Sequence, residues 1–351
     1  MIAMDGGNTI ELPGAIFAQR TKLMKNILVT GGAGYIGSHT CKALAQAGYN
    51  PITFDNLSTG HKHAVKWGPL EIGDIRDSEK LSAAFKKHNP EAVIHFASKI
   101  VVSESVKEPD DYYDNNVNGT LSLLNVMRAH SVNAIVFSST AAVYGYPESN
   151  PIDESHPLLP INPYGKTKLA CEWLLQDYQT AYEINFIALR YFNAAGADPD
   201  GEIGEEHDPE THLIPLILKA AKEDTEISIY GDDYDTPDGT CIRDYIHVTD
   251  LANAHIKALE YVVKNNKSET FNLGTGKGYS VREVLNIAKN VTGNEINEII
   301  SERRAGDPAE LMSKSIAVQN GLSWKPNLSV LEIIIETAWK RLIKQGIQRQ
   351  D

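Results

Sequence analysis

A glycine-rich turn between a short apolar run and a helical pattern constrains the fold more than any other feature of this chain. Residues 26–30 (NILVT) have the composition of a buried strand, and Gly31, Gly34 and Gly37 follow directly. The first glycine permits a tight turn, the second lets a ligand approach the backbone, and the third lets a helix pack closely on the strand. The pattern predicts a phosphate-binding helix N-terminus.

Strand and helix patterns alternate after this turn. Strands are predicted at residues 26–30, 51–55, 92–97, 134–138 and 185–191, and helices at residues 35–48, 78–88, 112–130 and 164–182. Such alternation is typical of a parallel sheet with helices on both faces. We therefore predict an α/β fold: a Rossmann-type, doubly wound parallel sheet, followed by a smaller mixed α/β domain at the C-terminal end.

The length of 351 residues suits about two domains. Residues 1–24 lack periodicity and are predicted to be a leader or a disordered extension. The first domain is predicted at residues 25–192, with residues 227–250 returning to it. The second would comprise residues 193–226 and 251–351. Helices are expected near residues 213–222, 281–290 and 330–344, and a loop at 196–209.

Asp55 indicates which dinucleotide the glycine turn would bind. It lies at the end of the second predicted strand, 18 residues beyond Gly37. At that position a carboxylate can accept hydrogen bonds from an adenosine ribose. It would also repel a 2′-phosphate, so the sequence favours NAD over NADP.

Tyr164 and Lys168 are the candidate catalytic pair. They are four residues apart in a predicted helix and so share one face. A nearby ammonium and a cationic nicotinamide ring would lower the tyrosine pKa from about 10. Ser138, Ser139 and Thr140 form a hydroxyl cluster after a predicted strand. A hydroxyl there could relay a proton between substrate and Tyr164.

Charge and cysteine content exclude several classes of protein. The chain has 46 acidic and 33 basic residues, a net charge of −13, which argues against nucleic-acid or anionic-membrane partners. Cys41, Cys171 and Cys241 are widely spaced, so a reducing, cytoplasmic location is expected. No HExxH motif and no apolar run of membrane-spanning length occurs. We therefore predict neither a metal site nor a membrane anchor.

Eight segments together carry a resemblance to a known family. They are GGAGYIGSH, HFAS, YYDNNVNGT, FSSTAAVYG, PYGKTK, RYFNAAGA, CIRDYIHV and FNLGTGKGYSV. In this order they resemble the UDP-glucose (UDP-galactose) 4-epimerases of the extended short-chain dehydrogenase/reductase family. The resemblance runs from about Lys25 to the C-terminus. It implies reversible C4 epimerisation in galactose metabolism through a transient 4-keto sugar, with tightly bound NAD.

The resemblance also implies roles for single residues. Tyr164 matches the catalytic base and Lys168 the lysine that holds the cofactor ribose. Thr140 stands where the family usually has a proton-shuttling serine. Further cofactor contacts are implied for Tyr35, Ile36, Asp55, Asn56, Asp74, Ile75, Phe96, Ala97, Ser98, Asn115 and Phe192. Lys99 is one position early for a lysine found in one subgroup, so no cofactor role is assigned to it.

The second domain would bind the nucleotide-sugar. The resemblance implies substrate contacts by Thr140, Asn193, Leu213, Tyr230, Arg243, Arg304, Asp307 and Leu311. Two arginines can chelate a diphosphate, Tyr230 can pack on uracil, and Asp307 can bind a ribose hydroxyl. Leu311 occupies the position that faces the C2 substituent of the sugar. Its intermediate size leaves acceptance of N-acetylated sugars open, and we favour the plain UDP-glucose and UDP-galactose pair.

Three other functions are weighed against this one. A nucleotide-sugar 4,6-dehydratase needs an acidic pair after the strand-end hydroxyl, where this chain has Ala141 and Ala142. A UDP-N-acetylglucosamine 4-epimerase, or an epimerase of dual specificity, stays open. A non-catalytic NAD-binding module would have no need of Tyr164, Lys168 and Thr140 together. The resemblance also implies a homodimer formed by the helices at residues 112–130 and 164–182.

Overall fold

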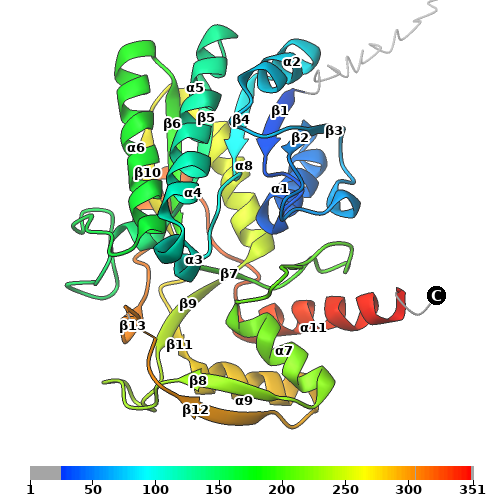
Figure 1. Cartoon of the computed structure of the whole chain (residues 1–351), viewed down its shortest axis with the longest axis vertical. Helices are drawn as coiled ribbons and strands as arrows, with labels where there is room; N and C mark the ends of the chain where they lie inside the picture. The colour runs from blue at the N-terminus through cyan, green and yellow to red at the C-terminus, as the bar shows by residue number, and fades with distance from the viewer. Residues whose placement is uncertain (1–24, 305, 349–351) are drawn as a thin grey trace, which may run out of the picture.

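The computed structural model describes residues 25–304 and 306–348, so the leader predicted at residues 1–24 lies outside the described residues. Its centre is a seven-stranded parallel sheet in the order β10-β6-β5-β4-β1-β2-β3 (Figure 1). The strands are β1 (Asn26–Thr30), β2 (Asn50–Asp55), β3 (Leu70–Ile72), β4 (Ala92–His95), β5 (Ala134–Thr140), β6 (Asn185–Tyr191) and β10 (Glu269–Leu273). Every residue of β5 is buried, as a central strand covered on both faces requires.

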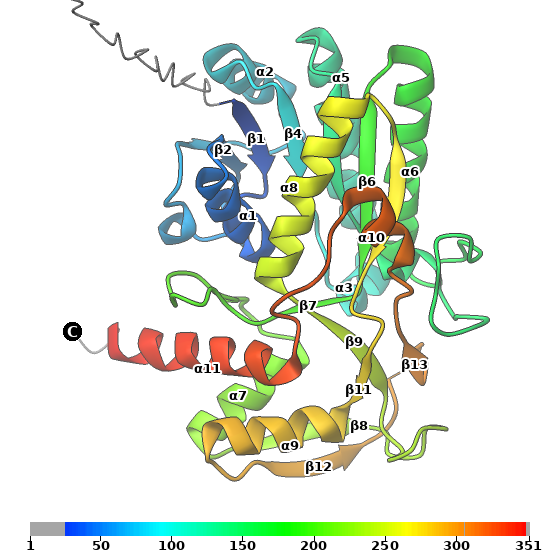
Figure 2. The same ribbon diagram turned by 180° about the vertical axis from the view of Figure 1, so that it is seen from behind.

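Helices cover both faces of this sheet and bury two separate apolar cores. On one face lie α2 (Ser78–His88), α5 (Gly119–Ala129) and α6 (Pro163–Tyr182), and on the other α1 (Tyr35–Gln46), α8 (Val248–Asn265) and α10 (Ile316–Leu322) (Figures 1 and 2). Phe85, Leu123 and Leu175 belong to the first core, and Leu44, Leu251 and Leu322 to the second. The predicted doubly wound α/β fold is confirmed.

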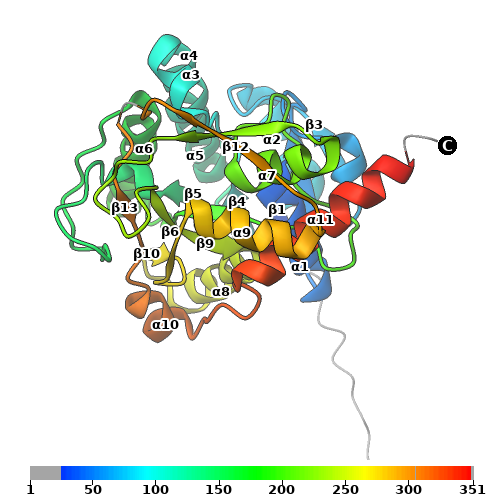
Figure 3. The ribbon, with the colours of Figure 1, turned by 90° about the horizontal axis from the view of Figure 1, so that it is seen from below.

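A smaller lobe lies below the carboxyl ends of the strands, as Figure 3 shows from below. Its strands are β7 (Asn193–Ala195), β8 (Glu226–Tyr230), β9 (Ile242–His247), β11 (Gly278–Ser280), β12 (Asn297–Ser301) and β13 (Glu310–Leu311). Its helices are α7 (Leu213–Glu223), α9 (Val281–Thr292) and α11 (Leu331–Gln348). These three helices pack around a third core that includes Ile217, Leu285 and Ile335. The lobe therefore has apolar contacts of its own.

Residues 227–250 do not return to the main sheet, and that prediction is wrong. Strand β8 pairs with β12, and β9 pairs with β7, β11 and β13 in a separate sheet. The return is made instead by α8 and β10, which pairs with β6. Helix α8, 18 residues long, was not predicted, although apolar residues recur along it at helical spacing.

The single helix predicted at residues 112–130 is divided in the structure. Helix α4 (Pro109–Tyr112) leads into a π-helical segment, η2 (Tyr113–Asn118), and then into α5. The wider π turn changes which side chains face α6, and such turns are frequent at functional sites. The other short elements are α3 (Val102–Lys107), η1 (Lys62–Ala64) and η3 (Ala141–Val143).

Candidate active site

The glycine turn connects β1 to α1 at the carboxyl edge of the sheet. Gly31 has φ +71°, and a Cβ there would lie 2.6 Å from the backbone nitrogen of Ala97. A larger residue is excluded by both conformation and space. The N–H groups of the first turn of α1 face the same edge, which suits an anionic group. This backbone fits a dinucleotide pyrophosphate.

Asp55 lies at the end of β2 with its carboxylate held by two backbone donors. Its Oδ2 accepts from the Ala33 N–H at 3.0 Å, and its Oδ1 accepts from the Leu57 N–H at 2.8 Å. Burial raises the pKa of Asp55, while these two hydrogen bonds lower it. The carboxylate is thereby fixed beside the glycine turn, in reach of a ribose, and each oxygen keeps a free acceptor site. The chain thus fits NAD at both its pyrophosphate and its ribose.

The other predicted cofactor residues lie along the same edge of the sheet. Tyr35 and Ile36 begin α1, whereas Asp74 and Ile75 follow β3. Asp74 accepts hydrogen bonds from Arg76 and from Asn56, and these lower its pKa. The remaining members follow β2, β4 or β6 or lie in η2, and they are Asn56, Phe96, Ala97, Ser98, Asn115 and Phe192.

Lys99 points away from this row of residues. Its ammonium is 2.8 Å from Asp111, 3.5 Å from Glu104, and lies 5.5 Å from the centroid of the Tyr112 ring. Its backbone N–H donates to Asn116 in η2. Lys99 therefore joins the loop after β4 to α4 and the π-helical segment.

Tyr164 and Lys168 lie in the first turns of α6, one above the other. Asn162 caps this helix, since its Oδ1 accepts from the Gly165 N–H at 2.8 Å, and Pro163 occupies the first helical position. The cap fixes where the helix begins, and so it fixes the positions of Tyr164 and Lys168 along the helix axis.

The side chains of Lys168 and Thr140 lie next to residues that are predicted to bind the cofactor. The Lys168 ammonium is 3.5 Å from the Ser98 hydroxyl and 4.5 Å from the centroid of the Phe137 ring. Thr140 ends β5, and its hydroxyl lies close enough to Tyr164 to lower the pKa of that phenol. The tyrosine, the threonine and the lysine thus converge at the carboxyl ends of β4 and β5.

Burial dominates the protonation of this group. It raises the pKa of Tyr164 to about 12, although the hydrogen bond from Thr140 acts to lower it. It also lowers the pKa of Lys168 to about 8, while Cys171 and Glu172 act to raise it. The expected depression of the tyrosine pKa is therefore not produced by the protein alone. A cation placed beside the phenol would lower the Tyr164 pKa in the direction that the sequence predicts.

A buried polar network that the sequence analysis missed supports this centre. Arg190 on β6 forms a bidentate ion pair with Glu172 on α6, at 2.9 and 2.6 Å. The Ser139 hydroxyl donates to Glu172 at 2.5 Å, and Arg190 also donates to the Tyr144 hydroxyl. Tyr144 in turn donates to Asn272 on β10. The only signal in the sequence was the position of Glu172, one turn after Lys168.

Tyr191 is a second neighbour that the sequence did not indicate. Its hydroxyl lies 2.6 Å from the Ser138 hydroxyl, and its pKa is raised by burial and then by the proximity of Tyr164. Each hydroxyl of the predicted cluster therefore has a different partner. Ser138 contacts Tyr191, Ser139 contacts Glu172, and Thr140 contacts the candidate base.

Most of the predicted substrate residues gather in the smaller lobe. The Arg304 guanidinium lies 3.9 Å from the centroid of the Tyr230 ring, and Arg243 is 3.3 Å from an oxygen of Asp307. The Asp307 N–H donates to the Arg304 carbonyl at 3.3 Å, which joins the two pairs. A ring, two guanidinium groups and a carboxylate are thereby presented together, as a nucleoside diphosphate requires.

Leu311 connects this cluster to the catalytic strand. It pairs with Arg243 across β13 and β9, and its side chain packs against the apolar cluster that includes Ala141 and Val143. Asn193 donates from its side chain to the Asp244 carbonyl at 2.9 Å and so joins β7 to β9. Leu213, by contrast, begins α7 and packs against the core of the smaller lobe.

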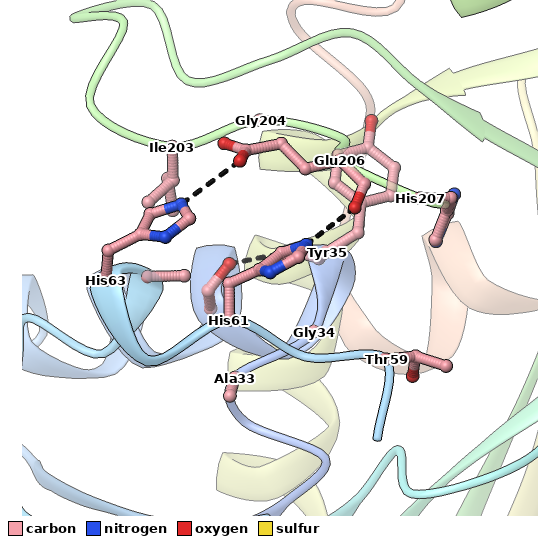
Figure 4. Close-up of a pocket in the computed structure, with 12 residues that line it drawn as sticks. Ala33, Gly34, Tyr35, Thr59, His61, His63, Ile203, Gly204, Glu206 and His207 are labelled. Atoms are coloured by element: carbon pink, nitrogen blue, oxygen red, sulfur yellow. Dashed lines mark hydrogen bonds and ion pairs between the residues drawn. The ribbon is translucent and has the colours of Figure 1, made fainter. Parts of the chain in front are cut away.

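The loop at residues 196–212 closes a pocket over the glycine turn. Figure 4 shows His61 and His63 below the loop and Glu206 above them. His61 contacts the Glu206 carbonyl at 2.7 Å, and His63 is 3.1 Å from its carboxylate. The Tyr35 hydroxyl donates to the Gly196 carbonyl at 2.6 Å. The loop is thus held directly over the predicted pyrophosphate site, lined further by Ala33, Gly34, Ser38, Thr59, Ala64, Ile203, Gly204 and His207.

Comparison with known proteins agrees with this geometry. Residues 27–274 match the model of the NAD dependent epimerase/dehydratase family. A UDP-glucose 4-epimerase of Rhizobium meliloti (strain 1021) is 52% identical over 315 residues, which cover 90% of this chain and 96% of that protein. No helix in the described residues combines the length and apolarity needed to cross a bilayer.

Two solved structures are also similar. The UDP-glucose 4-epimerase of Brucella ovis in complex with NAD has a TM-score of 0.88 and 50% identity, covering 90% of this chain and 98% of its own. The enzyme of Bifidobacterium longum in complex with NAD+ and UDP has a TM-score of 0.86 and 39% identity, covering 92% and 99%.

Proposed function

The chain belongs to the NAD-dependent epimerase/dehydratase family, and from that premise we propose that Tyr164, Lys168 and Thr140 catalyse its reaction. That reaction is the reversible C4 epimerisation of UDP-glucose and UDP-galactose, an isomerase activity with NAD as cofactor. The observation that carries the residue assignment is the convergence of these three side chains at the carboxyl ends of β4 and β5.

The catalytic steps follow from the positions of the hydroxyl groups. Bound NAD supplies the hydride acceptor and, on return, the hydride donor. Tyr164 takes the proton of the sugar 4-hydroxyl, directly or through Thr140, and gives it back after the 4-keto sugar has turned over. Lys168 holds the cofactor ribose and stabilises the phenolate form of Tyr164.

The smaller lobe holds the intermediate while the sugar turns. Arg243 and Arg304 bind the diphosphate, Tyr230 packs on the uracil ring, and Asp307 binds the ribose. Asp307 is paired with Arg243 at 3.3 Å. When UDP binds, its diphosphate would replace Asp307 as the counter-charge of Arg243. Asp307 would then be free to bind the ribose. Retention of UDP lets one active site present both faces of the sugar to the same cofactor.

The test is interconversion of UDP-galactose and UDP-glucose by the purified protein. We expect Tyr164→Phe to lower kcat by about 10²–10⁴ because it removes the acid–base group. Tyr178→Phe is the matched control, since Tyr178 lies on the same helix and hydrogen-bonds to Asn125. NAD content should be equal in both variants. Wild-type turnover by Tyr164→Phe would refute the assigned base.

Leu311 bears on substrate range. It is smaller than a tyrosine at this position, so the competing proposal is activity on N-acetylated UDP-sugars as well. The dehydratase alternative is disfavoured because Ala141 and Ala142 follow Thr140. We propose the plain UDP-sugars as the main pair. Assays of UDP-galactose and UDP-N-acetylgalactosamine side by side separate the two proposals.

A homodimer is proposed through the outer face of α5 and α6. Trp173 on α6 is 57% exposed, and Tyr182 on the same helix is also exposed. Large exposed aromatic side chains are enriched at interfaces. Light scattering should give twice the chain mass for the wild type and the chain mass for Trp173→Glu. Ile300→Glu, on the exposed edge of β12 in the other lobe, should stay dimeric.

A reducing, cytoplasmic location is proposed from the cysteines. Cys41, Cys171 and Cys241 are all buried and free. Extracellular proteins of this size more often oxidise such residues in pairs. Cell fractionation with a tagged full-length chain tests this proposal.

A further inference from the structure

Four potential metal ligands converge in the loop at residues 196–212, outside the catalytic centre. Glu205, His207, Glu210 and His212 each offer one donor atom, and these four atoms all lie within 4.8 Å of one another. Their spacing, E-x-H-x-x-E-x-H, differs from HExxH. A search for helical zinc motifs therefore passes over it. We propose that this cluster, hereafter the loop cluster, is a structural Zn²⁺ site.

Three of the separations within the loop cluster are near the edge length of a zinc tetrahedron, whereas Glu205 and His212 are in direct contact. His207 Nδ1 lies 3.2 Å from Glu205 Oε1 and 3.6 Å from Glu210 Oε1, and His212 Nδ1 lies 3.8 Å from Glu210 Oε1. Ligands bound to Zn²⁺ at about 2.0–2.1 Å in a tetrahedron are about 3.3 Å apart. His212 Nδ1 also contacts Glu205 Oε1. To bind the ion, His212 Nδ1 and Glu205 Oε1 would separate, while Glu210 would move toward the two imidazoles.

The chemistry of the donors favours a transition metal. Two imidazole nitrogens and two carboxylate oxygens are a donor set that suits Zn²⁺ better than Ca²⁺ or Mg²⁺, which prefer oxygen alone. Two carboxylates also neutralise the two charges of the ion. Glu205 is 5% exposed at its side chain, so its charge requires compensation.

A second cluster of carboxylates in the same loop is neutralised by a cation from the protein itself. Asp198, Asp200 and Glu202 surround the ammonium of Lys42 at 2.7–3.0 Å. In the loop cluster the facing groups are imidazoles instead. Imidazole can either be protonated and pair with the carboxylates or stay neutral and bind a metal. The two states carry the same net charge, because two protons on the imidazoles are exchanged for one divalent ion.

The position of the loop cluster explains what the ion would do. Glu205 adjoins Glu206, which contacts His63 and Arg341 over the glycine turn. His212 immediately precedes α7, the helix that begins at Leu213 in the smaller lobe. A metal ion bound by these four side chains would fix the loop against the start of α7 in the smaller lobe. The role is structural, because none of the four ligands contacts Tyr164 in the described contacts.

The test measures metal content and affinity in full-length protein. The purified protein is stripped with a chelator, desalted, exposed to Zn²⁺, desalted again and analysed by mass spectrometry for metal. We expect about one zinc per chain and a rise in Tm on adding Zn²⁺. Co²⁺ in place of zinc should give the visible absorption of a four-coordinate site.

Variants locate the ion. His207→Gln and His212→Gln should each weaken Zn²⁺ binding by more than the ~10–100-fold that loss of an outer hydrogen-bonding partner costs. His63→Gln is the control, because His63 faces the same loop from outside the loop cluster. Circular dichroism and NAD content verify folding of each variant. Less than stoichiometric zinc in the wild type, or unchanged zinc in the His207→Gln/His212→Gln double variant, would overturn the proposal.

Discussion

The proposed catalytic centre and the loop at residues 196–212 flank the same predicted cofactor site but are held in different ways. In the centre, Tyr164, Lys168 and Thr140 sit on a capped helix and a buried strand, and backbone hydrogen bonds set their positions. The loop is held by side-chain charges from α1 and α11. Loss of a buried contact beneath the centre should therefore destabilise the whole domain, whereas loss of a contact in the loop should open the loop alone.

The largest effect is expected from breaking the buried ion pair below the centre. Glu172→Gln leaves Arg190, whose side chain is 5% exposed, without its counter-charge. Removing one partner of such a pair typically costs about 3–5 kcal/mol. Urea denaturation should show this loss of the free energy of unfolding. The kcat should also fall while the KM for UDP-galactose changes little, because α6 carries the proposed catalytic pair.

The matching control removes both charges. Glu172→Leu/Arg190→Met leaves no unpaired charge and should recover much of the stability, as apolar replacements of buried pairs do. Equal destabilisation in the single and double variants would mean that packing, rather than charge, holds α6 against β6.

The next largest effect is a loss of folding stability in acid. It arises from His95, at the end of β4 in the main sheet. Burial lowers the pKa of His95 from 6.5 to about 3, where it lies between Thr30 and Thr120. Between pH 6.5 and 3, His95 is therefore protonated in the unfolded chain and neutral in the folded chain. The sign follows: this stability is present above pH 6.5 and is lost as pH falls toward 3.

The slope of this acid effect is measurable. One such histidine contributes about 1.4 kcal/mol per pH unit between pH 6 and 4. His39, His247 and His255 act in the same direction, because burial lowers each of their pKa values to about 4. His95→Gln should flatten the curve of unfolding free energy against pH by about one histidine's share. An unchanged slope would show that His95 is protonated in the folded protein.

The same contrast decides what could be predicted from the sequence. Strands 26–30 and 185–191 and helix 78–88 were predicted with the observed bounds, because apolar periodicity and caps are local signals. Asp55 was placed beside the glycine turn by the same reasoning. The partner of Glu172 was not predictable, because Arg190 reaches it only after β6 and α6 have packed.

No local sequence pattern predicted the ion pairs that hold the loop at residues 196–212. Lys42 meets Asp198 across 156 positions, and no periodicity links them. The misplacement of residues 227–250 has the same origin. Their apolar strand pattern is real, but the partner strand is decided by long-range pairing. Sequence patterns thus predicted elements well and neighbours poorly.

A smaller and more local effect is expected from the loop. Lys42→Met removes the cation that Asp198 faces at 2.8 Å, and Asp198 is 5% exposed at its side chain. An unsatisfied buried acceptor costs about 1–3 kcal/mol. Since Asp200 and Glu202 can turn to solvent, the loss should stay within the loop. Hydrogen exchange should quicken at residues 196–206 while β5 keeps its protection.

Lys66→Met is the control for the loop prediction. The exposed Lys66 donates to the Glu202 carbonyl at 3.0 Å, so its removal should change stability by less than about 0.5 kcal/mol. Faster exchange across β5 in Lys42→Met would contradict the independence of the two regions.

The smallest effect is expected where the two lobes meet, at Leu311. Its side chain packs beside Ala141 and Val143, which follow the proposed catalytic Thr140. Leu311→Ser removes bulk facing the proposed C2 position of the sugar, and Leu311→Tyr adds it. Pocket changes of this size are worth about 1–3 kcal/mol in discrimination. We expect Leu311→Ser to raise kcat/KM for UDP-N-acetylgalactosamine about tenfold relative to UDP-galactose, with Leu311→Tyr shifting the ratio the other way. Equal ratios in all three proteins would place the C2 substituent elsewhere, and the lobe boundary would then have no part in substrate choice.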